Sequence, residues 1–532
     1  MTTSYFHAPE GLKSWLTTTD HKKIAWLYLV AITAFFMIGA LAAGLMRLEL
    51  LTPRGDLVSA DVYNRLFSIH GITMVWFFLI PSIPTVLGNF LVPLMIGAND
   101  LAYPRLNLLS WYVFVFGGLF TLYATIDGGV DTGWTFYTPY STMFSNSHVL
   151  LAAFGIFVTG FSSVMTGLNF IVTIHKLRHP GMSWLKQPLF IWSIYATSVI
   201  LVLATPVLTA ALFLIALERI FNVGIFNPAL GGDPLLFQHI FWFYSHPAVY
   251  IMILPAMGVI SEIIPCFTRK RIFGYLFIAL SSSAIAFFGF LVWGHHMFTS
   301  GQSSYANMVF ALLSFMVAIP SGIKVFSWTA SLYKGKIYLR TPMIYALGFV
   351  LLFMVGGLSG LHLASLAIDL HVHDTYFVIG HFHYIMVGGA VMGYLGGGHF
   401  WWPKLVGKSY PEKWGRVSAV IIIVGFNLTF FPHFILGYQG MLRRYHEYPE
   451  SYAFLNALST SGLVLLGIGY FFPIVYLTLS LFRLGRTSGN YWPATGLEWT
   501  TPSPPEEKNF DTLPEKIPEA YDYSALGDLV EV

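Results

Sequence analysis

Charged residues and cysteine are both scarce in this chain of 532 residues. Asp, Glu, Lys and Arg make up 10% of it, whereas hydrophobic residues make up 56%, well above the share in ordinary soluble domains. The single cysteine, Cys266, excludes a disulfide framework and an all-cysteine metal site. Any metal must therefore be held by histidine or carboxylate side chains, and neither the composition nor the net charge of +3 suggests a nucleic-acid partner.

We also expect no cleavable signal sequence, because residues 1–23 contain no apolar stretch before the first long one. What the chain has instead is many long apolar runs, each close to the roughly 20 residues that a helix needs to cross a bilayer. They predict an all-α integral membrane protein with about twelve transmembrane helices. We expect these at residues 24–50, 66–96, 107–127, 148–174, 189–217, 239–264, 274–298, 303–333, 342–366, 376–401, 417–439 and 455–483.

Basic residues gather in alternate loops, for example Lys176, Arg269 and Lys334, which is typical of cytoplasmic loops. An even number of spans then puts both termini in the cytoplasm. The sequence divides into an N-terminal segment (1–23), a helical domain (24–483) and a tail (484–532). Because the tail is rich in proline and acidic residues, we expect it to run over the cytoplasmic surface without a core of its own.

Six histidines lie within the predicted spans, where an imidazole is costly and usually functional. They are His70, His246, His295, His296, His381 and His383. Taken singly, each could be a core histidine bonded to a carbonyl group. Together, six on four helices favour metal ligation. His381 and His383 are two residues apart and project from nearly opposite faces of one helix, so this helix can ligate two metals side by side.

Three of the histidines can form a trigonal copper site, for which imidazole is a suitable ligand. His246 lies one helical turn before Tyr250, on the same face. His295 and His296 are adjacent at the end of a span, where local unwinding would aim both inward.

At these residues the sequence resembles the haem-copper oxidase subunit I family. The shared motifs are His70-Gly71, His246-Pro247-Ala248-Val249-Tyr250, Trp293-Gly294-His295-His296 and His381-Phe382-His383-Tyr384. The resemblance covers the chain except the tail. It implies the family's helical bundle in a bacterial inner membrane, and four-electron reduction of O2 to water with electrons from cytochrome c, coupled to proton pumping.

The resemblance also implies two haems, expected to be of the a type, and one copper ion. His70 and His383 would be the axial ligands of a low-spin haem, and His381 the proximal ligand of a high-spin haem. His246, His295 and His296 would hold the copper. Tyr250 would be covalently linked to His246 and supply an electron and a proton when the O–O bond breaks.

Further residues match the family's outer-side positions. Arg443, Arg444 and Asp369 would lie beside the haem propionates, Trp134 would contact a cofactor, and Arg47 would bond the formyl group of the low-spin haem. His373 and Asp374 match magnesium ligands at the interface with subunit II, although a plain surface loop is an alternative. Implied partners are subunit II with a dinuclear copper centre, subunit III, further small subunits, and cytochrome c or a cytochrome c domain.

Two proton routes follow from the same resemblance. Ser261, Ser321 and Lys324 would lead to Tyr250, and Asn89, Asp100 and Asn107 would form a second entrance, unless Asp100 is simply a solvated loop residue. This sequence departs from the commonest pattern at Ala248, where many members have a glutamate. Tyr244 and Ser245 precede Ala248 by about one helical turn and resemble the Tyr-Ser pair of a subgroup without that glutamate.

Three alternatives remain. A secondary transporter also has about twelve spans, but it has no need for the paired histidines. A nitric oxide reductase of the same superfamily is disfavoured by Tyr250 and Lys324. Quinol oxidases of this family carry polar groups at the outer ends of the first two helices. The corresponding positions here are Ile38, Ala42, Val62 and Arg65, which disfavours a quinol donor.

Overall fold

The computed structural model describes residues 4–6, 11–483, 485, 487, 489–510, 512, 515, 517 and 519–523, except for the side chain of residue 483. Regular structure within these residues is helical, apart from two isolated bridges, Ser4 with Glu506 and Thr375 with Leu442. The all-α prediction is confirmed. Arg486 and Asp511, a basic and an acidic residue of the predicted tail, lie outside the described residues.

Eleven helical segments of the described chain are long and apolar enough to cross a bilayer. They are α2 (His21–Glu49), α3 to α4 (Ala60–Ile96), α5 (Pro104–Ile126), α6 (Val149–Lys176), α7 (Leu189–Phe221), α8 (Pro234–Thr268), α10 (Ser304–Leu332), α11 (Thr341–Ala364), α13 to α14 (Tyr376–Val406), α15 (Glu412–Tyr438) and α16 (Ala453–Arg483). These segments fall on eleven of the twelve predicted spans. The remaining one, predicted at 274–298, contains the shorter apolar helix α9 (Tyr275–Gly289).

The predicted seventh span is interrupted before it ends. Helix α9 stops at Gly289, and a short 3-10 turn, η6 (Trp293–Met297), follows after a non-helical link. This turn carries His295 and His296. The unwinding expected at these two histidines is therefore present in the fold.

Two other spans contain wide π-helical turns, which are often found at functional sites. Between α3 (Ala60–Met74) and α4 (Asn89–Ile96) lie η1 (Val75–Leu79) and η2 (Ser82–Gly88). The second of these includes a proline, which lacks the N–H that a regular helix requires. The π turn η7 (Met386–Val391) likewise links α13 (Tyr376–Ile385) to α14 (Met392–Val406).

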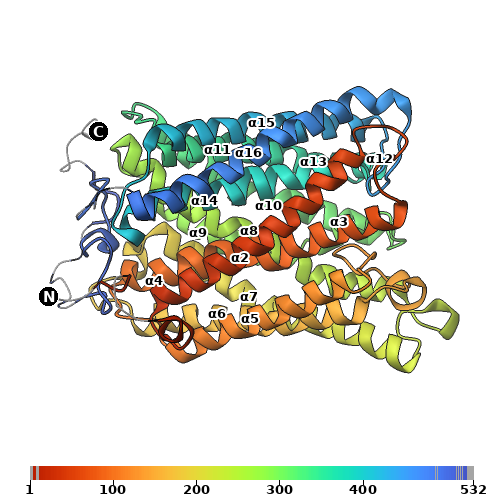
Figure 1. Cartoon of the computed structure of the whole chain (residues 1–532), viewed down its shortest axis with the longest axis horizontal. Helices are drawn as coiled ribbons and strands as arrows, with labels where there is room; N and C mark the ends of the chain where they lie inside the picture. Colours follow the sequence, from red (N-terminus) through yellow and green to blue (C-terminus); the bar gives the residue numbers. More distant parts are fainter. Residues whose placement is uncertain are drawn as a thin grey trace.

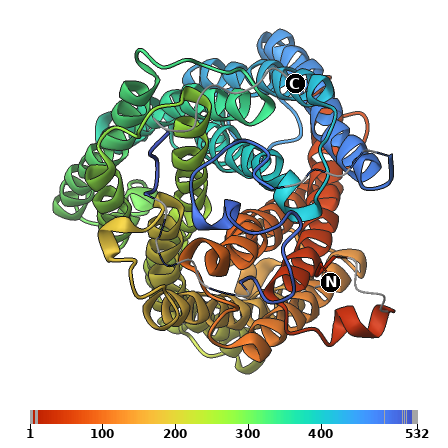
Figure 2. The ribbon, with the colours of Figure 1, turned by 90° about the vertical axis from the view of Figure 1, so that its left-hand side faces the viewer.

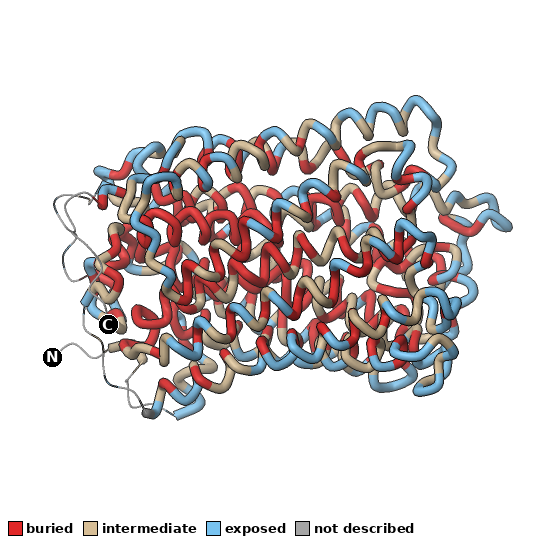
Figure 3. The backbone as a smooth tube through the Cα atoms, turned by 90° about the horizontal axis from the view of Figure 1, so that it is seen from above, coloured by how far each residue is buried: buried red, intermediate tan, exposed pale blue. Residues whose placement is uncertain are grey.

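The long helices run side by side as a bundle (Figure 1). Helices adjacent in sequence pack together, notably α5 with α6, α7 with α8, and α15 with α16. Viewed along the bundle, the chain passes around a central region (Figure 2). Buried residues fill the interior and exposed ones cover the outside (Figure 3). Outward-facing side chains such as Leu119, Phe287 and Phe326 are large and apolar, as a lipid-facing surface requires.

Helix α1 (Leu12–Leu16) and the described tail lie at the same end of the bundle, on the left of Figure 1. We call this the terminus-bearing end. Trp492 and Trp499 of the tail are each only 4% exposed and belong to the main core of the protein. The tail thus crosses the end of the bundle, but it is packed into the core more deeply than its composition predicts.

Candidate active site

A large, partly open cavity of about 1370 Å³ lies within the bundle. It exceeds the usual size of a pocket for one small ligand. Fifteen of the residues singled out in the sequence line it: Arg47, His70, Trp134, His246, Tyr250, His295, His296, Ser321, Asp369, His373, Asp374, His381, His383, Arg443 and Arg444. The fold therefore brings residues from distant helices to one site with room for large cofactors.

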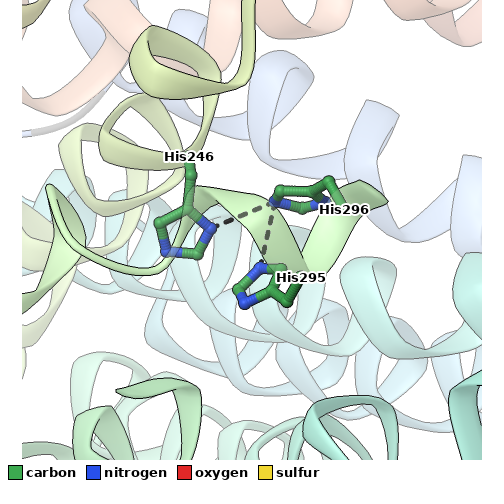
Figure 4. Close-up of side chains that lie close together, drawn as sticks. All are labelled: His246, His295 and His296. Atoms are coloured by element: carbon green, nitrogen blue, oxygen red, sulfur yellow. Dashed lines mark hydrogen bonds between the residues drawn. The ribbon is translucent and has the colours of Figure 1, made fainter. Parts of the chain in front are cut away.

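His246, His295 and His296 form a tight cluster at this cavity (Figure 4). His246 Nδ1 is 3.0 Å from His296 Nε2, and His295 Nε2 is 3.1 Å from the same atom. Three imidazole nitrogens converging in this way can coordinate one ion with metal–nitrogen distances of about 2 Å. The donor set fits copper, which imidazole ligates well. The ring of Trp242 stacks on His296 at 3.8 Å and restricts its rotation.

The surroundings of the cluster fix which nitrogen of His295 is free. Ser314 Oγ donates to the carbonyl of Phe310, so it accepts the hydrogen of His295 Nδ1 at 2.7 Å. This leaves His295 Nε2 as the lone-pair nitrogen that faces the other histidines. Sequence reasoning missed Ser314, although it lies two helical turns before Ser321 on the same face of α10 and could have been found by that spacing.

His246 keeps one nitrogen without a protein partner. Its Nε2 atom is buried and makes no hydrogen bond. The ring of Tyr250, one turn further along α8, lies 4.8 Å from the His246 ring, centroid to centroid. The unpartnered nitrogen and the neighbouring phenol are thus close together at the wall of the cavity.

His70 and His383 face each other across the cavity with nearly parallel rings. Their centroids are 6.4 Å apart and the ring planes differ by 13°. This separation is too wide for ring stacking, but it matches two metal–nitrogen bonds of about 2 Å plus the half-widths of two rings. In each residue Nδ1 is bonded to a backbone carbonyl, of Gly39 and Ile379 respectively. The pair therefore fits the axial ligation of a haem iron.

His381 is oriented by a different helix from its neighbour. Its Nδ1 atom lies 3.0 Å from the carbonyl of Gly356 and 3.1 Å from Ser359 Oγ, both on α11. His383, by contrast, stacks on Phe430 of α15. The two histidines of α13 thus contact different helices, His381 contacting α11 and His383 contacting α15. This is the arrangement that two adjacent iron sites require.

Cationic side chains form one wall of the cavity. Arg443 and Arg444 lie over the rings of Phe382 and Phe67, and Asp374, the acidic group beside Arg443, is 4.0 Å away. Burial and the adjacent Arg444 lower the pKa of Arg443 to about 10, so its guanidinium group remains charged at neutral pH. Arg443 Nε is buried without a partner. Two cations beside one exposed carboxylate fit an anionic ligand such as a haem propionate.

Arg47 contributes a second set of free donors. Its Nη2 atom donates to Asn456 and Thr460, whereas its Nε and Nη1 atoms are buried without partners. Because Arg47 lines the same cavity as His70, these donors fit a polar substituent of a haem bound there. Trp134 also lines this wall, 6.1 Å from the ring of Trp76.

His373, Asp369 and Asp374 lie together beside the arginine pair. His373 Nδ1 donates to Asp369 Oδ2 at 2.8 Å, and its Nε2 is 4.0 Å from Asp374. Burial alone would lower the pKa of His373, but the bond to Asp369 and the charge of that carboxylate raise it above its ordinary value. Asp374 adopts a positive φ of 52° in a loop and is 69% exposed. The group offers nitrogen and oxygen donors of the kind a divalent cation binds.

Lys324 is buried within α10 and bonded to α9. Its ammonium group donates to Ser282 Oγ at 2.8 Å and to the carbonyl of Ile278 at 3.0 Å. Ser261 accepts from the indole of Trp328. Neither Ser261 nor Ser321, which lines the cavity, is hydrogen-bonded to Lys324 directly. Ser282 was missed in the sequence because it lies on another helix, in a run of three serines.

Asp100 lies at the terminus-bearing end, in the loop between α4 and α5. Burial raises the pKa of Asp100 to about 7. Two asparagines lie deeper: the Asn89 Oδ1 and Asn107 Nδ2 atoms are buried without protein partners. Such amide atoms are normally satisfied by ordered water. These three residues thus fit the mouth of a hydrated path.

Tyr244 and Ser245 are both buried in α8, immediately before His246 of the three-histidine cluster. The Tyr244 ring stacks on Trp76 at 5.6 Å. Ser245 Oγ is buried and has no protein partner. Ala248, which follows them, is 1% exposed and presents no polar atom to the interior.

Comparison with known proteins accounts for this arrangement. Residues 23–465 match the family model described as cytochrome c and quinol oxidase polypeptide I. Proteins named cytochrome c oxidase subunit 1 are similar over nearly the whole chain: one from Synechocystis is 43% identical (96% of this chain, 93% of the relative) and one from Bacillus subtilis is 42% identical (94% and 81%). Another, from Cereibacter sphaeroides, is 40% identical (94% and 95%).

The fold has a solved counterpart. A structure described as a haem-copper terminal oxidase dimer matches with a TM-score of 0.74, at 21% identity, over 88% of this chain and 85% of that one. The likeness extends the match from sequence to architecture. The chain therefore belongs to the cytochrome c and quinol oxidase polypeptide I family, and it is the catalytic, membrane-embedded subunit of a haem-copper oxidase.

Proposed function

We propose that this subunit reduces O2 to water in a four-electron reaction with electrons from cytochrome c, and that it couples the reaction to proton pumping. The observation that carries the proposal is the cluster of His246, His295 and His296. It faces the same cavity that His70, His381 and His383 line. The names of the relatives support cytochrome c as the donor. The acidic and hydroxylic residues leading away from the cavity support proton transfer.

The proposed cofactors are two haems and one copper ion. His70 and His383 would hold the low-spin haem, His381 the high-spin haem, and the three-histidine cluster the copper. When bound, the haem iron and the copper supply electrons to O2. Arg443 and Arg444, with Asp369 nearby, would orient the propionates, Trp134 would pack against a cofactor, and the free donors of Arg47 favour a formyl-bearing a-type haem. His373 and Asp374 would bind magnesium.

Tyr250 is the group of this chain placed to supply a proton and an electron at the reacting centre. It lies beside the unpartnered nitrogen of His246, where the family's covalent link would form. Ser261, Ser321 and Lys324 would deliver protons toward it. Asp100 would collect protons for the second route, because a carboxyl group with a pKa near 7 both binds and releases a proton at neutral pH.

Further parts of the assembly belong to the same proposal. The terminus-bearing end would face the cytoplasm of a bacterium, with the chain in the inner membrane. The opposite end would meet subunit II, whose dinuclear copper centre would pass electrons inward, because this chain has a single cysteine and no thiolate pair of its own. Subunit III and further small subunits would cover lipid-facing helices.

The choice of donor gives a direct test of the function. With its partner subunits, the oxidase should consume O2 rapidly on reduced cytochrome c and at least about tenfold more slowly on quinol. The physical reason is that the presumed quinol-site positions offer few polar groups: Ala42 is buried and Val62 is an exposed aliphatic residue. The measurement is O2 consumption with each donor supplied alone. Fast consumption on quinol without cytochrome would overturn the assignment.

The Tyr244–Ser245 pair is proposed to replace the missing glutamate by a relay of hydroxyl groups and water. The double variant Tyr244→Phe with Ser245→Ala loses both hydroxyl groups. It keeps the aromatic ring at position 244, which stacks on Trp76. We expect proton-coupled oxidation to slow by about tenfold or more and pumping to diminish, with haem and copper contents unchanged. Proton release by the oxidase in vesicles measures this. Parental turnover and pumping would exclude the relay, and the route through Lys324 would then be the alternative path for the protons.

A further inference from the structure

The C-terminal tail contributes a buried polar side chain to the mouth of the Asp100 route. Asn509 is 2% exposed, although it belongs to a Pro-rich, acidic segment that composition alone places on the surface. The tail crosses the terminus-bearing end of the bundle, as the dark-blue trace in Figure 2 shows. There Asn509 contacts the start of α2 and the loop that carries Asp100.

The amide of Asn509 makes three hydrogen bonds that join separate segments. Its Nδ2 atom donates to the carbonyl of Ala98 at 2.9 Å, two residues before Asp100. Its Oδ1 atom accepts from Lys22 Nζ at 2.9 Å. A carbonyl can only accept and an ammonium can only donate, so these two partners fix the orientation of the amide.

The second hydrogen of the amide points at His21. Asn509 Nδ2 lies 2.9 Å from His21 Nε2, and His21 Nδ1 lies 2.6 Å from the carbonyl of Asn89. Because that carbonyl accepts, Nδ1 carries the hydrogen and Nε2 is the acceptor. The neutral ring therefore transmits the position of Asn509 to Asn89, whose own Oδ1 atom is buried without a protein partner.

Asn509 thus touches both sides of the first step of the route. On one side it holds the loop of Asp100 through Ala98, and on the other it holds Asn89 through His21. It also fixes the ammonium group of Lys22, which is paired with Asp20 at 3.0 Å. These two ions are the charged neighbours that act on Asp100, while burial raises the pKa of its carboxyl group to about 7.

We infer that Asn509 is a positioning residue for proton uptake at Asp100. The inference rests on the proposed function of the Asp100 route. The tail would act by keeping Asp100 and Asn89 at a constant separation, so that water between them stays in line. A shift of a fraction of an ångström would break such a hydrogen-bonded path.

The test is the rate of proton uptake by the complete oxidase during a single turnover with O2, followed with a pH-indicator dye. Asn509→Leu keeps the size of the side chain and removes all three bonds. We expect uptake to slow about tenfold, with unchanged haem spectra. Asn509→Asp keeps the acceptor for Lys22 and loses both donors, so it should also be slow, and it decides the matter if the leucine variant fails to assemble.

Asn490→Leu is the matched control, because this asparagine of the same tail bonds to the backbone of Ala494. It should take up protons at the parental rate; slowing equal to that of Asn509→Leu would mean that any loosening of the tail suffices, and would overturn the role of Asn509. Parental uptake in both Asn509 variants would overturn it too.

A double variant separates this role from general damage. Asp100→Asn should itself slow uptake, and adding Asn509→Leu should then slow it no further, because both act on one step. A further tenfold loss would show that Asn509 acts elsewhere. If Asp100→Asn leaves uptake unchanged, the proposed route fails and the inference fails with it. If only the Asn509 variants are without effect, the route stands and the inference alone is wrong.

Discussion

Replacing His295 or His296 by alanine should abolish O2 reduction while the low-spin haem spectrum persists. Each change removes one of three converging nitrogens, of which His246 Nδ1 and His295 Nε2 each lie about 3 Å from His296 Nε2, and the remaining two cannot hold the ion in the same geometry. We expect turnover to fall by about a thousandfold or more, which corresponds to about 4 kcal/mol of transition-state stabilisation. Metal analysis should show loss of copper with iron retained.

His70→Ala should give the complementary result. Its partner across the cavity, His383, would remain, but one imidazole alone cannot maintain a six-coordinate iron, so the low-spin haem signal should disappear. His362→Ala is a suitable control, because His362 bonds to the Leu358 carbonyl on α11 and does not line the cavity.

The His295 and His296 variants also have a contradicting outcome. If both retained copper at full occupancy and reduced O2 normally, the assignment of these histidines as copper ligands would be wrong.

Lys324→Met should produce the second large effect, a loss of turnover of about 100-fold, which is within the range of a proton-transfer contribution. Methionine has a similar length and volume but cannot bind a proton. The ammonium group reaches Ser282 and the Ile278 carbonyl on α9, and the substitution removes both of these hydrogen bonds. Reduction of the metal centre in a stopped-flow experiment should slow, while cofactor spectra remain normal.

Ser282→Ala provides a graded comparison for Lys324→Met. It removes one of the two acceptors of Lys324 and leaves the other, a loss of about 1 kcal/mol, so turnover should fall by less than about tenfold. If Lys324→Met keeps parental turnover, proton delivery along this route is wrong. If Ser282→Ala is as severe as Lys324→Met, the lysine acts chiefly through Ser282 and not through its own charge.

The spans and the grouping of histidines could be predicted because both follow from strong local rules. Apolar runs must be helical in a bilayer, and imidazoles at membrane depth need partners. Even the unwound turn at His295 and His296 is implied by two adjacent residues that must point to one site. The family resemblance then assigned roles to positions such as Arg443 that composition alone does not distinguish.

Contacts between distant segments could not be predicted in the same way. Ser282 is an ordinary serine in an apolar helix, and only the packing of α9 against α10 shows that it holds Lys324. The burial of parts of the tail could not be predicted for a related reason. Its composition resembles that of a solvated segment, yet Trp492, Trp499 and Asn509 are buried because the end of the bundle offers them partners.

The shortness of α9 has an electrical consequence. Its 15 residues rise by about 22 Å, and the turn with His295 and His296 comes next, so the reaction centre is separated from the terminus-bearing end by most of the bilayer. If the proposed routes deliver protons from that side to make water, each proton would move across this distance through the membrane voltage, at a cost of up to about 2.3 kcal/mol per 100 mV. Charging the membrane should therefore slow turnover even in a variant that no longer pumps.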